Sequence, residues 1–208
     1  MDSASKLRLI GRPWQSDAEY LDIQDRESSW SHSSIWGEVS AKKFVKYGHM
    51  IADLMFHDDQ VADFGGNDGF AAYNFYMVHK VKPLVVDCSP PRLEFAGRVF
   101  HLPTYETFIE SMPELKDKQI DWAYSSHTIE HTRDPEKSLR EIARVVKRQC
   151  LLVLPLESAN HAQHRNHAHT CSFPSAGAWK KFMEANGWKV IRHARVGKHE
   201  AQFIAEPR

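Results

Sequence analysis

The chain has 208 residues, the size of one α/β domain, and is long enough to bury a full hydrophobic core. Lysine plus arginine and aspartate plus glutamate both number 27, so no basic surplus points to nucleic acid or an anionic membrane as a partner. The three cysteines form no CxxC pair, the N-terminal stretch MDSASKLRLIGRPW lacks the apolar core of a secretory signal, and no apolar run is long enough to span a membrane, which together predict a cytoplasmic protein.

The first half of the chain reads as an arm followed by alternating helices and strands. Residues 1–36 have no helical or strand period, so we expect an irregular arm or lid, with its tryptophans packing on the domain. A helix is expected over 37–57 and another over 70–79. Apolar runs predict strands at 61–64 and 84–87, and the less regular segment that follows predicts a short helix at 92–99 and a strand near 99–102.

The second half continues the alternation. We expect a strand at 120–126, a helix at 134–146 that begins with Asp134 as N-cap and Pro135 in its first turn, and a buried strand at 150–156. A histidine-rich loop, a helix over 175–186 and an antiparallel hairpin follow. The sequence therefore predicts a three-layer, Rossmann-like α/β fold with a mostly parallel sheet, in which 37–208 form a single domain.

The segment VADFGGNDGF is the most informative part of the sequence. It predicts a strand that ends at Asp63, a tight turn, and the start of a helix. The turn residues tolerate positive φ and leave backbone N–H groups open to a polar ligand; they are Gly65, Gly66, Asn67 and Gly69. Asp87 ends the next strand, and a glycine turn followed about twenty residues later by a strand-end carboxylate is typical of a nucleoside site. The alternative is a purely structural turn.

Four segments in order resemble the class I S-adenosylmethionine-dependent methyltransferases: VADFGGNDG, VVDCS, IDWAYSSHTIEHTRDPEKSLREIARVVK and LLVLPLE. The resemblance covers 52–207 and is greatest for members with a leu-glu-his segment after the fourth strand. It implies a seven-stranded sheet closed by the C-terminal antiparallel hairpin, and S-adenosylmethionine as cofactor. The implied cofactor-binding residues are Asp63, Gly65, Gly66, Asn67, Gly69, Asp87, Cys88, Ser89, Ser125, Ser126 and His127.

The sequence departs from the family pattern at three points. Asn67 replaces the central glycine of the turn, and the segment after the second strand lacks the acidic residue that often contacts adenine, where Tyr105 or Glu106 would substitute. The Asn/Asp-Pro-Pro-aromatic signature of enzymes that methylate base amines is also absent, which argues against nucleobase amines. A nicotinamide dinucleotide is disfavoured because Asp63 and Asp68 would repel its pyrophosphate, whereas both suit a cationic amino group or sulfonium.

The chain has thirteen histidines, and six of them form two clusters, after the fourth and fifth predicted strands, that need an explanation. A base is needed only if the methyl acceptor must lose a proton, and the candidates are His127, His131, His167 and His169. HTIEH also matches the HxxEH pattern of one class of zinc proteases, but that motif requires a helix and here it follows a strand. The loop HAQHRNHAH can supply metal ligands, but a polar lid is favoured, so we expect no metal.

The sequence therefore predicts methyl transfer from S-adenosylmethionine to a small-molecule acceptor, at an oxygen, a nitrogen or a carboxylate. The alternative is a catalytically silent cofactor-binding or scaffold domain of the same fold, and an NAD-dependent oxidoreductase is third. We expect neither a nucleic-acid nor a membrane partner. Transfer from a sulfonium needs no acid for the leaving group, so alignment of the reactants is the main task of the protein.

Overall fold

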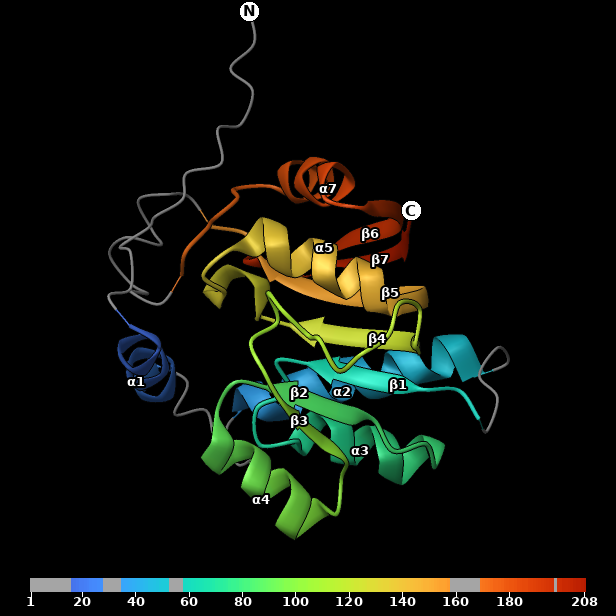
Figure 1. Cartoon of the computed structure of the whole chain (residues 1–208). Coiled ribbons are helices and arrows are strands. Elements are labelled where there is room, and N and C mark those ends of the chain that lie inside the picture. The colour runs from blue at the N-terminus through green and yellow to red at the C-terminus, as the bar shows by residue number, and fades with distance from the viewer. Residues whose placement is uncertain (1–15, 28–34, 53–57, 158–168, 197) are drawn as a thin grey trace, which may run out of the picture.

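The computed structural model describes residues 16–27, 35–52, 58–157, 169–196 and 198–208. Its centre is a seven-stranded sheet in the order β3-β2-β1-β4-β5-β7-β6 (Figure 1). Neighbouring strands are parallel except at β7, which runs antiparallel to both β5 and β6. The strands are β1 (Val61–Phe64), β2 (Leu84–Asp87), β3 (Thr104–Glu106), β4 (Ile120–Ser126), β5 (Val146–Pro155), β6 (Trp188–Val196) and β7 (Glu200–Pro207). The predicted mostly parallel sheet with a C-terminal hairpin is confirmed.

Helices cover both faces of this sheet, as the three-layer prediction requires (Figure 1). One apolar cluster joins the sheet to α2, α3 and α4, and a second joins it to α5 and α7. The helices are α1 (Asp17–Glu27), α2 (Ile35–Ile51), α3 (Phe70–His79), α4 (Pro90–Phe100), α5 (Pro135–Val145) and α7 (Ala176–Ala185), with a short 3-10 helix η2 (Ile129–His131). In the described residues, none of these helices has the length and apolar character needed to cross a membrane.

Aromatic side chains fix the layers to the sheet. On one face, the ring of Phe44 stacks on Phe75 and on Tyr124, with centroids 4.2 and 4.4 Å apart. On the other face, the indole nitrogen of Trp179 donates to the carbonyl of Pro155 at 2.7 Å, so α7 is held against the end of β5. Both faces of the central strands are thereby buried, which explains why β1, β4 and β5 appear in the sequence as nearly continuous apolar runs.

Two predictions about the elements are wrong. Residues 1–36 are not wholly irregular, because 17–27 form α1, whose mostly polar sequence buries Tyr20 without presenting an apolar stripe. The strand expected near 99–102 is absent, since α4 continues to Phe100 and ends at His101 in the left-handed conformation. Leu102 is buried in the helical layer rather than paired in the sheet, and β3 begins two residues later. The helix predicted over 37–57 is α2, which ends at Ile51, and 53–57 lie outside the described residues. The other predicted strands and helices are confirmed within a few residues of their ends.

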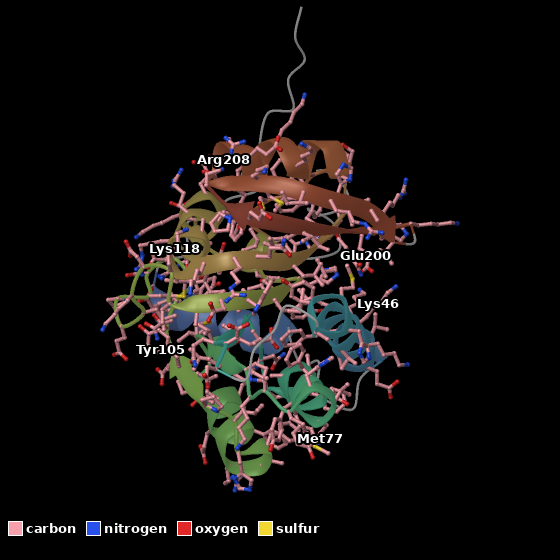
Figure 2. All side chains as sticks on the ribbon, turned by 90° about the vertical axis from the view of Figure 1, so that its right-hand side faces the viewer. Lys46, Met77, Tyr105, Lys118, Glu200 and Arg208 are labelled. Carbon is pink, nitrogen blue, oxygen red and sulfur yellow. The ribbon has the colours of Figure 1, made fainter. Side chains whose placement is uncertain are left out.

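The parallel strands place their carboxyl ends at one edge of the sheet. Because β7 runs the other way, its first residue, Glu200, lies at this same edge and pairs in register with Pro155 at the end of β5. Figure 2 shows Glu200 at this end of the sheet and Lys118, which precedes β4, at the opposite end. Residues far apart in the sequence therefore meet at this edge, where open α/β sheets usually bind their ligands.

Candidate functional site

A cavity of about 600 Å³ opens at the carboxyl edge of the sheet, a volume typical of small-molecule sites. Its walls come from the turn after β1, the ends of β2 and β4, the segment after β3, η2, and the start of β7. Helices α1 and α2 also contribute side chains. The polar residues that matter most for the argument are Tyr20, Lys43, Asp63, Asn67, Asp87, Glu110, His127, His131, Glu157, His169 and Glu200.

The turn after β1 has the backbone that its glycines predict. Gly65, Asn67 and Gly69 have φ angles of 73°, 53° and 79°, so Asn67 does occupy the left-handed region. The N–H groups of Gly65 and Gly66 donate to the carbonyl of Val86 at 2.8 and 3.2 Å, which ties the turn to β2. A side chain at Gly66 would lie 2.8 Å from Val85. The turn is therefore held close to β2, and the contact with Val85 leaves no room for a larger residue at Gly66.

Asp87 is fixed by the backbone of two segments. Its Oδ2 accepts the N–H of Asn67 at 2.9 Å, and its Oδ1 accepts the N–H of Ser89 at 3.0 Å. Burial raises the pKa of this carboxyl, while Arg92 and the backbone N–H groups act in the opposite direction. Each oxygen keeps a second acceptor direction, so the carboxylate can receive two hydroxyl groups without releasing the turn.

Asp63 is the more buried of the two carboxyls, and it has fewer polar partners than Asp87. It is only 2% exposed, and its Oδ2 has no hydrogen-bond partner within the part of the chain that the structure describes. Burial, followed by the charges of Asp87 and Asp68, raises the pKa of Asp63 to about 8. A cationic ligand group in the cavity would give this oxygen a partner and favour its ionised form. The site thus fits a ligand that combines a ribose with a positive charge.

His127 lies at the centre of a chain of charges at the other end of the cavity. Its Nδ1 is 3.1 Å from Oε1 of Glu130, and its Nε2 is 3.2 Å from Oε2 of Glu200, which also accepts from Lys43 at 2.6 Å. Burial alone would lower the pKa of His127, but the hydrogen bonds with Glu130 and Glu200 raise it to about 9. With both ring nitrogens engaged by carboxylates, His127 has no nitrogen with which to accept a proton from a substrate.

His131 and His169 meet beside this chain although they come from different segments. Their rings are nearly perpendicular, with centroids 4.6 Å apart. Burial lowers the pKa of His131 to about 4, against the opposing charge of Glu130 and with a further contribution from His169. Nδ1 of His169 is 2.8 Å from Oε2 of Glu157, so a carboxylate orients this second imidazole.

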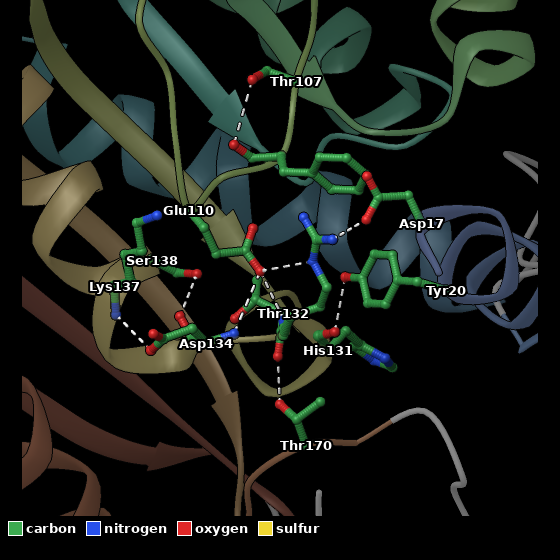
Figure 3. A network of polar contacts seen from close by, with 12 residues as sticks. Asp17, Tyr20, Thr107, Glu110, His131, Thr132, Asp134, Lys137, Ser138 and Thr170 are labelled. Carbon is green, nitrogen blue, oxygen red and sulfur yellow. Dashed lines mark hydrogen bonds and ion pairs between the residues drawn. The ribbon is translucent and has the colours of Figure 1, made fainter. Parts of the chain in front are cut away.

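Helix α1 closes one side of this end of the cavity. The hydroxyl of Tyr20 donates to the carbonyl of His131 at 2.9 Å, and Asp17 forms an ion pair with Arg133 (Figure 3). The guanidinium of Arg133 lies 4.0 Å from the ring centre of Phe108, which also lines the cavity. The predicted arm therefore contributes a side chain to the cavity wall; its role as a lid stays a prediction.

Most of the predicted site residues lie together. Those that line the cavity are Asp63, Gly65, Gly66, Asn67, Asp87, Cys88, Ser126, His127, His131 and His169. Three others do not line the cavity: Gly69 at the start of α3, Ser89 before α4, and the buried Ser125. His167 lies outside the described residues.

Several residues of the cavity wall are not among those predicted from the sequence. Neither Tyr105 nor Glu106 reaches the cavity, which is lined instead by the segment that follows them, 107–110. Lys43 and Glu200 could not be predicted, because their ion pair joins α2 to the start of β7 and no local sequence pattern indicates it. Glu110 could have been found, because it is a lone acidic residue in a stretch of apolar and small residues after β3.

Comparisons with known proteins identify this architecture. A family model described as a methyltransferase domain matches residues 62–154, which run from β1 to β5. No curated protein matches the sequence closely enough to count as a relative. The structure is similar to the protein that was solved in complex with the Haloferax volcanii Trm112 methyltransferase activator, with 16% identity, a TM-score of 0.71, and coverage of 91% of this chain and 98% of that chain.

Two further solved structures share the fold. YcgJ of Bacillus subtilis is 22% identical with a TM-score of 0.60, covering 76% of this chain and 73% of that chain. The geranyl diphosphate C-methyltransferase of Streptomyces coelicolor A3(2), solved in complex with S-adenosyl-L-homocysteine, is 12% identical with a TM-score of 0.63, covering 78% and 76%. At such identities the likeness shows the fold alone, so the acceptor has to be argued from the residues of this chain.

Proposed function

Because the chain belongs to the class I S-adenosylmethionine-dependent methyltransferases, we propose that it transfers the cofactor's methyl group to an oxygen or nitrogen of a small, polar acceptor. The observation that supports the proposal best is the continuity of the cavity. The same cavity is lined by Asp63 and Asp87 at one end and by the histidines at the other, so cofactor and acceptor share one space.

The cofactor end has the groups that S-adenosylmethionine requires. The carboxylate of Asp87 would receive the two ribose hydroxyls, and Asp63 would face the cationic amino-acid part, where its unpartnered Oδ2 gains a partner. A charge-assisted hydrogen bond contributes about 1.5–3 kcal/mol, so the two carboxylates can account for much of the binding free energy. The cofactor itself supplies a methyl group on a good leaving group, and the chain has to align it.

The acceptor end assigns different roles to the candidate histidines. His127 is a positioning residue, because Glu130 and Glu200 occupy both of its ring nitrogens. His131 and His169 line the cavity and are the groups that face the acceptor. The aligned geometry is the main source of rate, since fixing two reactants in position can contribute roughly 7–11 kcal/mol.

The acceptor class is tested with a labelled methyl group. The purified full chain is incubated with tritiated-methyl S-adenosylmethionine and a cell extract, and the label is then measured separately in small molecules, nucleic acid and protein. We expect label in the small-molecule fraction, together with S-adenosylhomocysteine as product. Label that enters only nucleic acid or protein would contradict the proposal. Calorimetry with S-adenosylmethionine and with NAD is the control: binding of NAD in its place, or cofactor binding with no turnover on any fraction, argues for the alternative functions.

A further inference from the structure

Three potential metal ligands converge beside the cofactor cavity. Glu130 and His131 lie in η2, and His169 comes from the segment before α7. One ligand atom of each residue lies within 4.8 Å of the other two, and no second group of this kind occurs among the described residues. In the sequence these residues belong to two separate motifs, HTIEH and the histidine-rich loop, and neither motif predicts a metal site by itself. The fold brings one part of each motif to the same point.

The carboxyl of Glu130 supplies an independent observation. The side chain is completely buried, and its Oε1 is used by His127 at 3.1 Å. Its other oxygen, Oε2, is also buried and has no hydrogen-bond partner in the described part of the chain. A buried polar atom left without a partner destabilises the fold, and a charged one does so more strongly. A cation between Glu130 and the two imidazoles would remove this destabilisation.

The surrounding contacts orient the three ligands. The N–H of Thr170 donates to the carbonyl of Glu130 at 2.6 Å. The hydroxyl of Thr170 donates to the carbonyl of Thr132 at 2.5 Å, as Figure 3 shows. These two bonds hold Thr170, the residue after His169, against Glu130 and Thr132, the two residues that flank His131 in the sequence. The carboxylate of Glu157 holds Nδ1 of His169 at 2.8 Å, which directs its Nε2 as the coordinating nitrogen. Such carboxylate–histidine pairs are the usual outer support of protein metal sites.

We infer that Glu130, His131 and His169 bind a divalent transition-metal ion at the acceptor end of the cavity. Two imidazoles and one carboxylate suit zinc, iron(II), cobalt or manganese better than calcium or magnesium, which prefer oxygen ligands. Bonds of about 2.1 Å to one ion would bring the ligand atoms to roughly 3–3.5 Å from each other, so binding needs the widest pair to close by at most roughly 1.3–1.8 Å from the observed limit of 4.8 Å.

The position of the ion gives it a role, and this part of the inference rests on the proposed methyl transfer. His131 and His169 line the cavity, so open coordination positions would face the acceptor. A coordinated hydroxyl loses its proton more readily, because the cation stabilises the negative oxygen. The proton passes to water, an oxygen electron pair forms the bond to the methyl carbon, and the carbon–sulfur electrons remain on sulfur. The products are a methyl ether, S-adenosylhomocysteine and a hydrated proton, which makes a hydroxyl compound the expected acceptor.

Metal binding is tested without cofactor or acceptor. The full chain is stripped with a chelator, dialysed, and titrated with Co²⁺ by absorption spectroscopy and with Zn²⁺ by calorimetry. We expect one tight site per chain, and we expect His131→Asn and His169→Asn each to weaken it at least about tenfold. The matched control is His101→Asn, an exposed histidine in the left-handed conformation that asparagine tolerates, and it should bind as the wild type does.

The outcomes separate this inference from the proposed function. Wild-type protein that binds neither ion, or His131→Asn and His169→Asn variants that bind both ions undiminished, would overturn the metal site. Retained binding of S-adenosylmethionine by the variants shows that they are folded. Methylation by the stripped protein should fall at least about tenfold and return on adding metal; equal rates with and without metal would overturn the role of the ion. Metal binding by a protein that fails to bind S-adenosylmethionine would instead count against the proposed function.

Discussion

The two ends of the cavity carry charge in opposite ways. At the cofactor end, burial raises the pKa values of both Asp63 and Asp87, and the charge of Asp87 adds to the rise at Asp63. At the acceptor end, Lys43, Glu200, His127 and Glu130 alternate in sign, so each charge has an opposite neighbour. Asp63 therefore has no opposite charge beside it in the described part of the protein, whereas the protein supplies an opposite charge to each member of the chain from Lys43 to Glu130.

The difference also appears in how each end is supported. Asp87 is held by backbone N–H groups of its own and the neighbouring turn, which any side chains at those positions would supply. His127 is held by side chains from η2 and β7, the second of them 73 residues away in the sequence. The cofactor end is therefore specified by backbone shape and the acceptor end by particular side-chain pairs. Substitutions that test each kind of support should have different signatures.

The largest effect is expected from Asp87→Asn. An amide cannot accept two backbone N–H groups through both of its terminal atoms, and it lacks the charge that strengthens hydrogen bonds to ribose hydroxyls. The dissociation constant for S-adenosylmethionine, measured by calorimetry, should rise about 100-fold or more, which corresponds to about 2.7 kcal/mol. Glu106→Gln is the matched control, because this exposed carboxyl pairs in register with Asp87 on β3. An equal loss in both variants would show that general electrostatics, and not this contact, holds the cofactor.

The next effect is a pH-dependent gain in stability for Asp63→Asn without cofactor. Burial raises the folded-state pKa of Asp63 to about 8, above its ordinary value of 3.8. As far as Asp63 is concerned, the stability of the wild type is therefore highest below pH 3.8, and this part of it is lost as the pH rises toward 8. Asparagine does not titrate. Between pH 5.5 and 8, the stability advantage of the variant over the wild type should therefore grow by up to about 3 kcal/mol, at about 1.4 kcal/mol per pKa unit.

Denaturant unfolding at several pH values measures this gap. Saturating S-adenosylmethionine should narrow or reverse this stability difference. The bound cation favours ionised Asp63 in the wild type, whereas the asparagine of the variant offers it no negative charge. A stability difference that is the same at pH 5.5 and pH 8 would mean that Asp63 is not the titrating group. A gap that survives saturating cofactor would mean that no cation binds near this carboxyl.

Much of the fold was predictable because its signals are local. The strands at 61–64, 84–87 and 120–126 are short apolar runs bounded by turns, and Asp134 with Pro135 marks the start of α5 from adjacent residues alone. The failures share a physical cause. Helix α1 has little apolar surface to reveal it, and the apolar end of α4 resembles a strand until the left-handed residue His101 is seen to stop a helix.

The site divides in the same manner. The turn after β1 and the carboxylate of Asp87 could be predicted, since the chemistry of a nucleoside site follows from a glycine turn and one strand end. Lys43 and Glu200 could not, because they are 157 residues apart and meet only through the antiparallel placement of β7. Glu130 and His131 belong to a motif that can be seen in the sequence, but their convergence with His169 depends on the tertiary structure, which places the segment before α7 against η2.

The smallest effect tests the contact where the two ends meet. A side chain at Gly65, which has a φ of 73°, would lie 2.2 Å from Oγ1 of Thr128, the residue after His127. Gly65→Ala should therefore lower the free energy of unfolding by about 2 kcal/mol, from backbone strain and from displacement of Thr128. Adding Thr128→Ala should restore the steric part but not the strain from φ. Denaturant unfolding of the single and double variants measures this coupling. Gly97→Ala is the control without a clash: its side chain meets nothing closer than 4.0 Å, and inside α4 it should leave stability unchanged or raise it slightly. If Thr128→Ala restores none of the stability that Gly65→Ala removes, the two ends of the cavity are independent structures. Restored stability in the double variant would show that the turn that holds the cofactor also sets the position of the acceptor end.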